Sequence, residues 1–174
     1  DNDLDIFFGY RFAHYFENIN GVYEERTEFS GISLDGLTGV VAGDIDNNGY
    51  QDILKMRFVD TLANILELNL GNNIFNTVEY LPSPFLLDIH GQGLLDADLD
   101  GDLDIFSIQD EGSQQAFLFL NQGNNPFGEP EFLQAFTYDA DETSSSRTMA
   151  IIDYDNDGDQ DIFVVRKFGI NWLL

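Results

Sequence analysis

Three nine-residue segments carry an oxygen-bearing side chain at every odd position and a glycine at the sixth. Residues 44–52, 96–104 and 153–161 fit the pattern D-x-D-x-[DN]-G-x-x-D, and we name them the first, second and third loop. Oxygen ligands gathered in so short a segment suit a hard divalent cation. The candidate metal-binding residues at positions 1, 3, 5, 7 and 9 are Asp44, Asp46, Asn48, Tyr50 and Asp52, then Asp96, Asp98, Asp100, Asp102 and Asp104, then Asp153, Asp155, Asp157, Asp159 and Asp161.

Repulsion between carboxylates makes an empty loop unfavourable. Two unit charges about 4 Å apart repel by about 1 kcal/mol even in water, and the second loop carries five carboxylates. Ca²⁺ reverses the sign of this energy, because it accepts about six to eight oxygens in flexible geometry, whereas Mg²⁺ demands a stricter octahedron. We expect the side chains of positions 1, 3, 5 and 9 and the backbone carbonyl of position 7 to meet the ion. Tyr50 is compatible with position 7 for that reason, and the sequence predicts about one Ca²⁺ per complete loop, three in all.

The chain begins within a fourth, incomplete copy of the loop. Asp1 to Phe7 align with Asp100 to Phe106. The sequence therefore predicts a partial fourth site formed by Asp1, Asp3 and Asp5. Because residue 1 is not a methionine, we expect the chain to be processed or part of a longer one.

Three competing structures for these loops fit the sequence less well than a calcium site between strands. An EF-hand loop starts in the same way but needs a bidentate glutamate at position 12, where this chain has Lys55, Ser107 and Val164. A calcium-binding β-helix would repeat the motif every nine residues, which does not occur here. A solvated acidic turn would not recur at one spacing. We expect the ions to be structural rather than catalytic, because the loops supply a full set of ligands.

The charge of the whole chain excludes several functional classes. The 174 residues carry 32 acidic and 7 basic side chains, a formal charge of −25. Such a chain has no basic patch for a phosphate backbone and no apolar run of about 20 residues to span a bilayer. Apolar stretches recur between the acidic clusters, which disfavours disorder. There are no cysteines, so disulfides give no indication of the compartment.

Short apolar segments between the loops predict β-strands. The loops start 52 and 57 residues apart, a period typical of four-stranded propeller blades. Two complete repeats each contain four such segments. In both repeats a Gly-Asn-Asn sequence, at 71–73 and at 123–125, predicts the turn between the third and fourth segments. The predicted strands are 37–43, 52–59, 64–70 and 75–81, then 89–95, 104–108, 115–121 and 131–136, with further strands near Ile6, Tyr15 and Tyr23 and three after Met149, the last at 170–174.

These segments predict an all-β fold, a single β-propeller segment over 1–174. Its blades are expected at 1–30, 37–81, 88–136 and 148–174, with the first and last incomplete. About three and a half blades are too few to close a ring, since propellers have about four to eight. We therefore expect the chain to continue elsewhere or to be completed by a partner.

The repeats resemble the FG-GAP/VCBS family, whose D-x-D-x-D-G-x-x-D loops lie in the hairpins of a β-propeller. The resemblance covers essentially the whole chain. It implies calcium in each loop, a site on the propeller face away from the usual ligand face, and an adhesive or scaffolding task outside the cytoplasm, at the cell surface or in secreted form. One departure is the first loop, which has three carboxylates against five in the others. We predict that it binds calcium most weakly.

The resulting hypothesis is a calcium-binding extracytoplasmic module without enzymatic activity, which binds a protein or glycan. The histidines, His14 and His90, form no catalytic motif. Two alternatives stay open: the propeller portion of a secreted polysaccharide-degrading enzyme, and a building block that self-associates through its incomplete end blades. We expect the segment 139–147 to be a surface connection, and it is the best candidate for a partner contact. Three aromatic residues could stack on sugars or fill gaps between blades. They are Tyr10, Tyr23 and Trp172.

Overall fold

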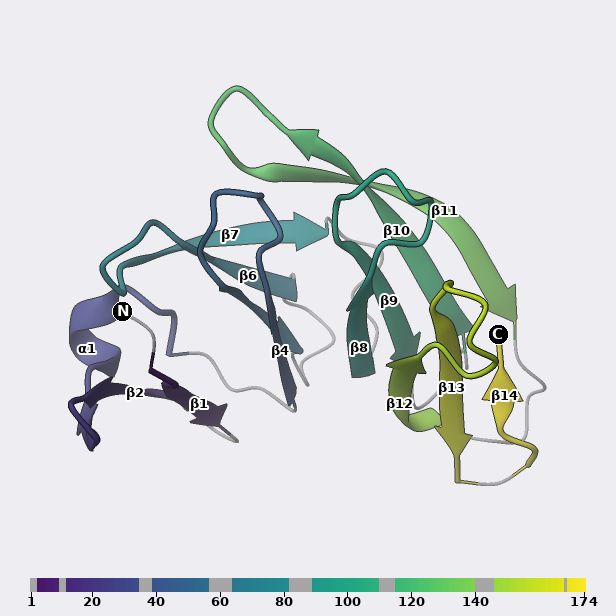
Figure 1. Cartoon of the computed structure of the whole chain (residues 1–174), viewed down its shortest axis with the longest axis horizontal. Helices are drawn as coiled ribbons and strands as arrows, with labels where there is room; N and C mark the ends of the chain where they lie inside the picture. Colours follow the sequence, from purple (N-terminus) through teal and green to yellow (C-terminus); the bar gives the residue numbers. More distant parts are fainter. Residues whose placement is uncertain are drawn as a thin grey trace.

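The structure, a computed structural model, is built from four antiparallel sheets that follow one another along the chain (Figure 1). It describes residues 3–9, 12–34, 39–56, 64–81, 89–109, 115–139, 146–167 and 169–174. Asp1, Tyr10 and most of the 139–147 segment lie outside these ranges, so the predictions made for them stay predictions. The prediction of an all-β fold is confirmed.

The two inner sheets have four strands each, in simple up-and-down order. The second sheet contains β4 (Gly39–Gly43), β5 (Asp52–Met56), β6 (Asn64–Asn69) and β7 (Phe75–Leu81). The third contains β8 (Ile89–Leu95), β9 (Asp104–Gln109), β10 (Gln115–Asn124) and β11 (Pro130–Asp139). Alternating apolar residues and short turns explain this pattern, because a meander pairs each strand with the next one along the chain.

The two outer sheets have three strands each among the described residues. The first contains β1 (Ile6–Gly9), β2 (Ala13–Ile19) and β3 (Val22–Glu25), followed by the short helix α1 (Thr27–Ser30), which the sequence pattern did not predict. The fourth contains β12 (Ser146–Ile152), β13 (Asp161–Arg166) and β14 (Trp172–Leu173). The predicted incompleteness of the first and last blades stays a prediction.

One predicted turn is wrong. Gly123 and Asn124 lie within β10, at a register shift between Asn121 and Asn124. The turn itself comes later, where the Asn125 side chain accepts hydrogen bonds from the backbone N–H groups of Phe127 and Glu129 at 2.8 and 3.1 Å. This side-chain closure stabilises a turn two residues beyond the glycine and lengthens the hairpin.

The apolar cores lie between sheets rather than within them. One cluster joins the second and third sheets and includes Leu54 and Phe117, and another joins the third and fourth sheets and includes Phe106 and Val164. A smaller cluster around Tyr15 and Phe75 joins the first and second sheets. Consecutive sheets therefore pack face to face, and the first strands of adjacent sheets, β4, β8 and β12, lie next to one another.

Among the described residues, no helix has the length and hydropathy needed to cross a bilayer.

Candidate metal centre

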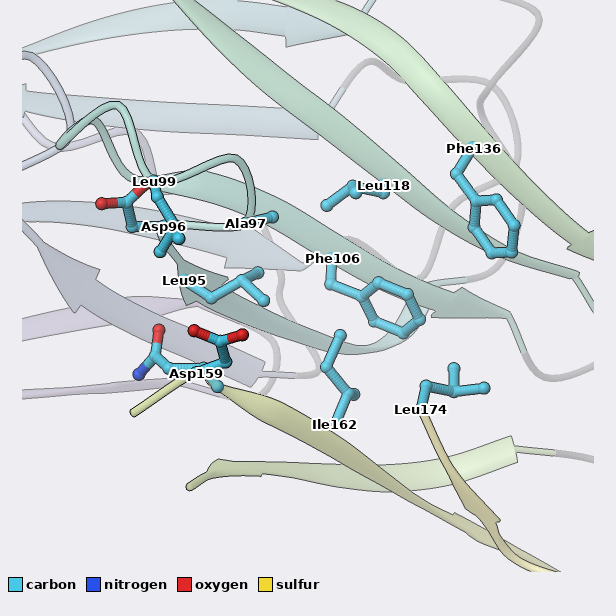
Figure 2. Close-up of a pocket in the computed structure, with 11 residues that line it drawn as sticks. Leu95, Asp96, Ala97, Leu99, Phe106, Leu118, Phe136, Asp159, Ile162 and Leu174 are labelled. Carbon is cyan, nitrogen blue, oxygen red and sulfur yellow. The ribbon is translucent and has the colours of Figure 1, made fainter. Parts of the chain in front are cut away.

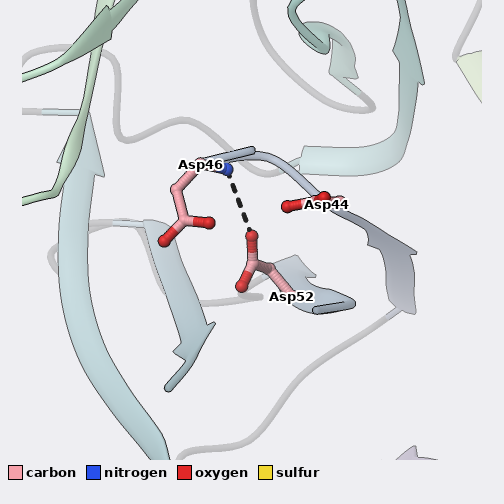
Figure 3. A group of neighbouring side chains, drawn as sticks. All are labelled: Asp44, Asp46 and Asp52. Carbon is pink, nitrogen blue, oxygen red and sulfur yellow. Dashed lines mark hydrogen bonds between the residues drawn. The ribbon is translucent and has the colours of Figure 1, made fainter. Parts of the chain in front are cut away.

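Each complete loop connects the first two strands of its sheet and brings three carboxylates together. Positions 1, 3 and 9 converge in every case, with one oxygen of each residue within 4.8 Å of the others. Oxygens that each lie about 2.3 to 2.6 Å from one Ca²⁺ cannot be more than about 5 Å apart, so the spacing fits a shared ion. Figure 3 shows the group of the first loop. The groups are Asp44, Asp46 and Asp52, then Asp96, Asp98 and Asp104, then Asp153, Asp155 and Asp161.

Backbone hydrogen bonds hold the first carboxylate of each loop in the same way. The N–H of the position 6 glycine donates to the Oδ2 atom of position 1, over 2.9 Å from Gly49, 3.0 Å from Gly101 and 3.2 Å from Gly158. All three glycines have a positive φ, between 91° and 101°. A residue with a side chain adopts that backbone only with strain, so glycine is required at this bend.

The last carboxylate of each loop is fixed by the start of the same loop. The N–H of position 2 donates to the Oδ2 atom of position 9, over 2.8 Å in the first loop, 2.7 Å in the second and 2.8 Å in the third. This bond closes the loop into a ring. The backbone thereby orients one oxygen of the first aspartate and one oxygen of the last aspartate in each loop.

Positions 5 and 7 have different roles from the three grouped carboxylates. At position 5, the side-chain oxygens of Asn48, Asp100 and Asp157 accept the N–H of position 7 at 2.8, 2.9 and 3.0 Å. The groups of three do not include the side chains of Asp102 and Asp159 at position 7. Each loop thus contributes the same number of grouped carboxylates. The predicted weakness of the first loop then depends on Asn48 at position 5 alone, and it stays a prediction.

Among the described residues, two carboxylate oxygens are buried without a hydrogen-bond partner. These are the Oδ1 atoms of Asp44 and Asp96, both at position 1. An unpaired buried oxygen is costly unless a cation or water satisfies it. Because the donors gathered in the three groups are all oxygens, the residues fit Ca²⁺ better than a metal that prefers nitrogen or sulfur.

Burial changes the protonation of these carboxylates when no ion is bound. It raises the pKa of Asp52 to about 6, although the N–H groups of Asn69 and Ile45 lower it. Burial likewise raises the pKa values of Asp46 and Asp104. A group with a raised pKa is poorly stabilised as an anion, and a divalent cation supplies the missing positive charge.

Sequence reasoning missed an asparagine that supports the position 9 carboxylate in the first and second loops. The backbone N–H groups of Asn69 and Asn121 donate to the Oδ1 atoms of Asp52 and Asp104, both over 2.8 Å. The side-chain oxygens of the same asparagines accept the N–H of Gly71 and of Gly123. The signal was present, since an Asn-x-Gly sequence follows position 9 by 17 residues in both repeats.

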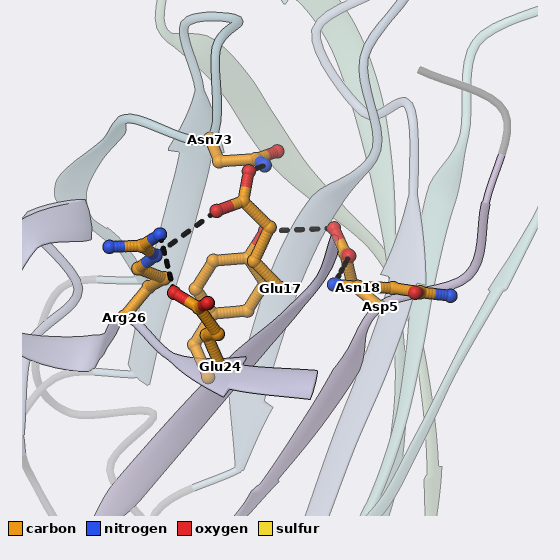
Figure 4. Close-up of polar contacts among 7 residues, drawn as sticks. Asp5, Glu17, Asn18, Glu24, Arg26 and Asn73 are labelled. Atoms are coloured by element: carbon orange, nitrogen blue, oxygen red, sulfur yellow. Dashed lines mark hydrogen bonds and ion pairs between the residues drawn. The ribbon is translucent and has the colours of Figure 1, made fainter. Parts of the chain in front are cut away.

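The half loop at the start of the chain keeps part of this design. Asp5 occupies the place of position 9, and its Oδ1 atom accepts the N–H of Asn18 at 2.8 Å. Its Oδ2 atom accepts the Tyr15 hydroxyl at 2.8 Å, where the complete loops use a backbone N–H (Figure 4). Among the described residues, Asp3 and Asp5 join no group of three carboxylates. The partial fourth site stays a prediction, because Asp1 lies outside the described residues.

The EF-hand alternative is excluded by the surroundings of the loops. Position 12 falls on β5, β9 and β13, where Lys55, Ser107 and Val164 are fully buried in the sheets. The strands on either side of each loop replace the helices of an EF-hand.

Trp172 is half-buried against Tyr138, with ring centres 4.8 Å apart, so it fills the gap between the third and fourth sheets.

Comparison with known proteins agrees with this geometry. The profile of the FG-GAP-like repeat matches residues 96–164, from the first aspartate of the second loop to β13. The matched segment contains the second and third loops and most of the third sheet. A search of curated proteins gave no match. Residues 96–164 are therefore an FG-GAP-like repeat, set in an all-β chain whose antiparallel sheets are consistent with the propeller blades of that family.

Proposed function

We propose that this chain is a noncatalytic module that binds calcium in its three complete loops. The observation that carries the proposal is the same three-carboxylate group, at positions 1, 3 and 9, in three successive sheets. In each loop these carboxylates would hold the ion, and a side-chain oxygen of position 5 and the carbonyl of position 7 would complete its shell. The bound ion would supply positive charge that a chain of net charge −25 lacks.

Calcium in this position would stiffen the module rather than perform chemistry. Each loop joins the first two strands of a sheet, so an ion held there fixes the hairpin from which the sheet is built. We propose that the stiffened sheets present their connecting loops to a protein or glycan outside the cytoplasm, in adhesion or scaffolding. This location is supported by the abundance of calcium there, since sites built from exposed loops need abundant calcium.

Calorimetric titration of the metal-free chain tests the proposal. We expect about three Ca²⁺ ions to bind and the melting temperature to rise, because a ligand held only by the folded form stabilises it by about 2.7 kcal/mol per site at 100 times its Kd. Magnesium at the same concentration should have a smaller effect. Asp155→Asn should reduce the stoichiometry to two, whereas the matched control Asp159→Asn, at position 7 of the same loop, should keep three. Binding of no calcium, or an equal loss in both variants, would refute the proposal.

A second role, self-association, is supported by exposed apolar side chains on the outer sheets. Ile6 and Phe8 of β1 are 41% and 51% exposed, while Phe7 between them packs against the core. On β13 and β14 the paired residues Phe163 and Leu173 are 38% and 48% exposed. In the inner sheets, the corresponding faces are covered by the neighbouring sheet. We propose that a second copy of the chain covers them.

A further inference from the structure

Hydrogen bonds through Asn121 of β10 connect the first loop to the second. The backbone N–H of Asn121 donates to Asp104 Oδ1, and its side-chain Nδ2 donates to the carbonyl of Ile45 at 2.9 Å. Asp104 belongs to the carboxylate group of the second loop, and Ile45 lies between Asp44 and Asp46 in the first. A single buried asparagine therefore contacts a carboxylate of one group and the backbone that carries two carboxylates of the other.

Two exposed asparagines strengthen this connection. Asn124 Nδ2 donates to the carbonyl of Asp46 at 2.8 Å, so β10 fixes two successive peptide groups of the first loop. In the opposite direction, Asn47 Nδ2 of the first loop donates to Asp102 Oδ1 of the second at 2.7 Å. This contact also gives the position 7 aspartate of the second loop a role that does not require it to bind an ion.

The second and third loops meet in a different way. Leu99 occupies position 4, where the first loop has Asn47, and it cannot donate to Asp159 at position 7 of the third loop. Instead both residues line a cavity of about 360 Å³, together with apolar side chains such as Phe106 and Ile162 (Figure 2). In the described part of the chain, no hydrogen bond joins these two loops.

We propose that Asn47, Asn121 and Asn124 are positioning residues that make the first two loops one cooperative calcium-binding unit, while the third loop binds independently. The inference rests on the proposed calcium binding. An ion in the second loop fixes Asp104, which fixes Asn121 and with it the peptide between Asp44 and Asp46. The first loop is then ordered before its own ion arrives, so that ion binds more tightly. By linkage, an ion in the first loop strengthens binding in the second by the same factor.

The position 6 glycines provide a separate reporter for each loop. The N–H groups of Gly49, Gly101 and Gly158 each donate to the first carboxylate of their own loop, so the amide NMR signal of each responds to the ion bound there. We would titrate the ¹⁵N-labelled chain with calcium and compare it with Asp98→Asn, which removes a grouped carboxylate of the second loop. The midpoint for Gly49 should rise about fivefold. The midpoint for Gly158 should not change.

Removing the exposed bridges should weaken this effect, because only the Asn121 bridge then remains. In the Asn47→Ala/Asn124→Ala variant, Asp98→Asn should shift the Gly49 midpoint by clearly less than fivefold. The matched control is Asn76→Ala, an exposed asparagine of β7 outside the connection, in which the fivefold effect should persist. Asn121 is almost fully buried, so its substitution could disturb folding, and the exposed pair carries the test for that reason.

The results separate the two proposals. If Asp98→Asn leaves Gly49 unchanged, the cooperative unit is refuted while calcium binding stands. If the full fivefold coupling persists without Asn47 and Asn124, the role of these two residues in the coupling is refuted. If Gly158 shifts together with Gly49, the independence of the third loop is refuted. If none of the three glycine signals responds to calcium, the proposed function fails and the coupling fails with it.

Discussion

Asp52 shows how one residue is prepared for an ion before the ion binds. It is fully buried, its two oxygens accept N–H groups from opposite sides, and burial still raises its pKa to about 6. Backbone donors alone therefore do not stabilise the anion. Asp104 repeats the arrangement in the next sheet. In the first two loops the position 9 carboxylate is thus both the structural closure of the loop and a buried anion that a cation would stabilise.

The raised pKa of Asp52 predicts an unusual pH dependence. Between its ordinary value of 3.8 and about 6, the folded metal-free chain holds a proton on Asp52 that the unfolded chain has lost. Rising pH therefore favours unfolding, and the free energy of unfolding should fall by about 2 to 3 kcal/mol from pH 4 to pH 7. Denaturant unfolding of calcium-stripped protein measures this. With saturating calcium the trend should reverse, because protons then compete with the ion. A metal-free chain that becomes more stable toward pH 7 would contradict the prediction.

At the scale of elements, the second sheet contains a buried ion pair between two neighbouring strands, β5 and β6. Lys55 on β5 lies 2.5 Å from Glu67 on β6, and both side chains are fully buried. The Lys55 ammonium also donates to the carbonyl of Ser33, whose N–H donates to Glu67. The pair therefore attaches the connection between the first and second sheets to the second sheet. The corresponding residues of the third sheet are neutral, Ser107 and Phe119.

Breaking this pair on one side should be costly. Lys55→Met leaves the Glu67 carboxylate buried without its partner, and we expect a loss of about 3 to 5 kcal/mol in the free energy of unfolding. Lys55→Met combined with Glu67→Leu removes both charges and should recover a large part of that loss. Chemical denaturation at pH 7 compares the three proteins. Equal stability of the single and double variants would show that the pair is not the source of the effect.

The sequence predicted the elements that repeat and missed the contacts that cross between repeats. The D-x-D pattern includes positions 1, 3 and 9, which the fold brings together, because a closed loop depends on residues no more than nine apart. The bond from Asn121 to Ile45 joins residues 76 apart, and no spacing rule within one repeat reveals it. The Lys55–Glu67 pair was missed for a related reason, since only strand pairing brings the two residues together. The side-chain closure by Asn125 overrode the glycine that predicted an earlier turn.

At the scale of the whole molecule, close contact between sheets depends on the absence of side chains. A Cβ atom on Gly43 would lie 2.6 Å from Leu94 of the third sheet and 2.8 Å from Leu103 of the second loop. A side chain at Gly43 would therefore displace the ends of these two leucine side chains. The inner faces are therefore complementary in shape, whereas the outer faces at Phe8 and Phe163 are apolar and exposed.

Those outer faces predict association in solution. With calcium present, we expect analytical ultracentrifugation to give a mass above the 19.7 kDa of one chain, because apolar sheet faces gain free energy when they are covered. Phe8→Ser/Phe163→Ser should reduce the mass toward that of the monomer. The matched control is Phe29→Ser, which changes an exposed phenylalanine of α1. A single chain at about 100 µM protein would refute self-association, given that weak contacts form at such concentrations.

Each apolar core is shared by two consecutive sheets, and this has a consequence for how such a molecule can change. A substitution in one sheet alters the packing of its two neighbours and leaves more distant sheets unaffected, so stability is approximately a sum of nearest-neighbour terms. A gene that duplicates one sheet with its loop would add an interface of the same kind without redesigning an interior. Length can therefore vary during evolution while the existing interfaces keep their geometry.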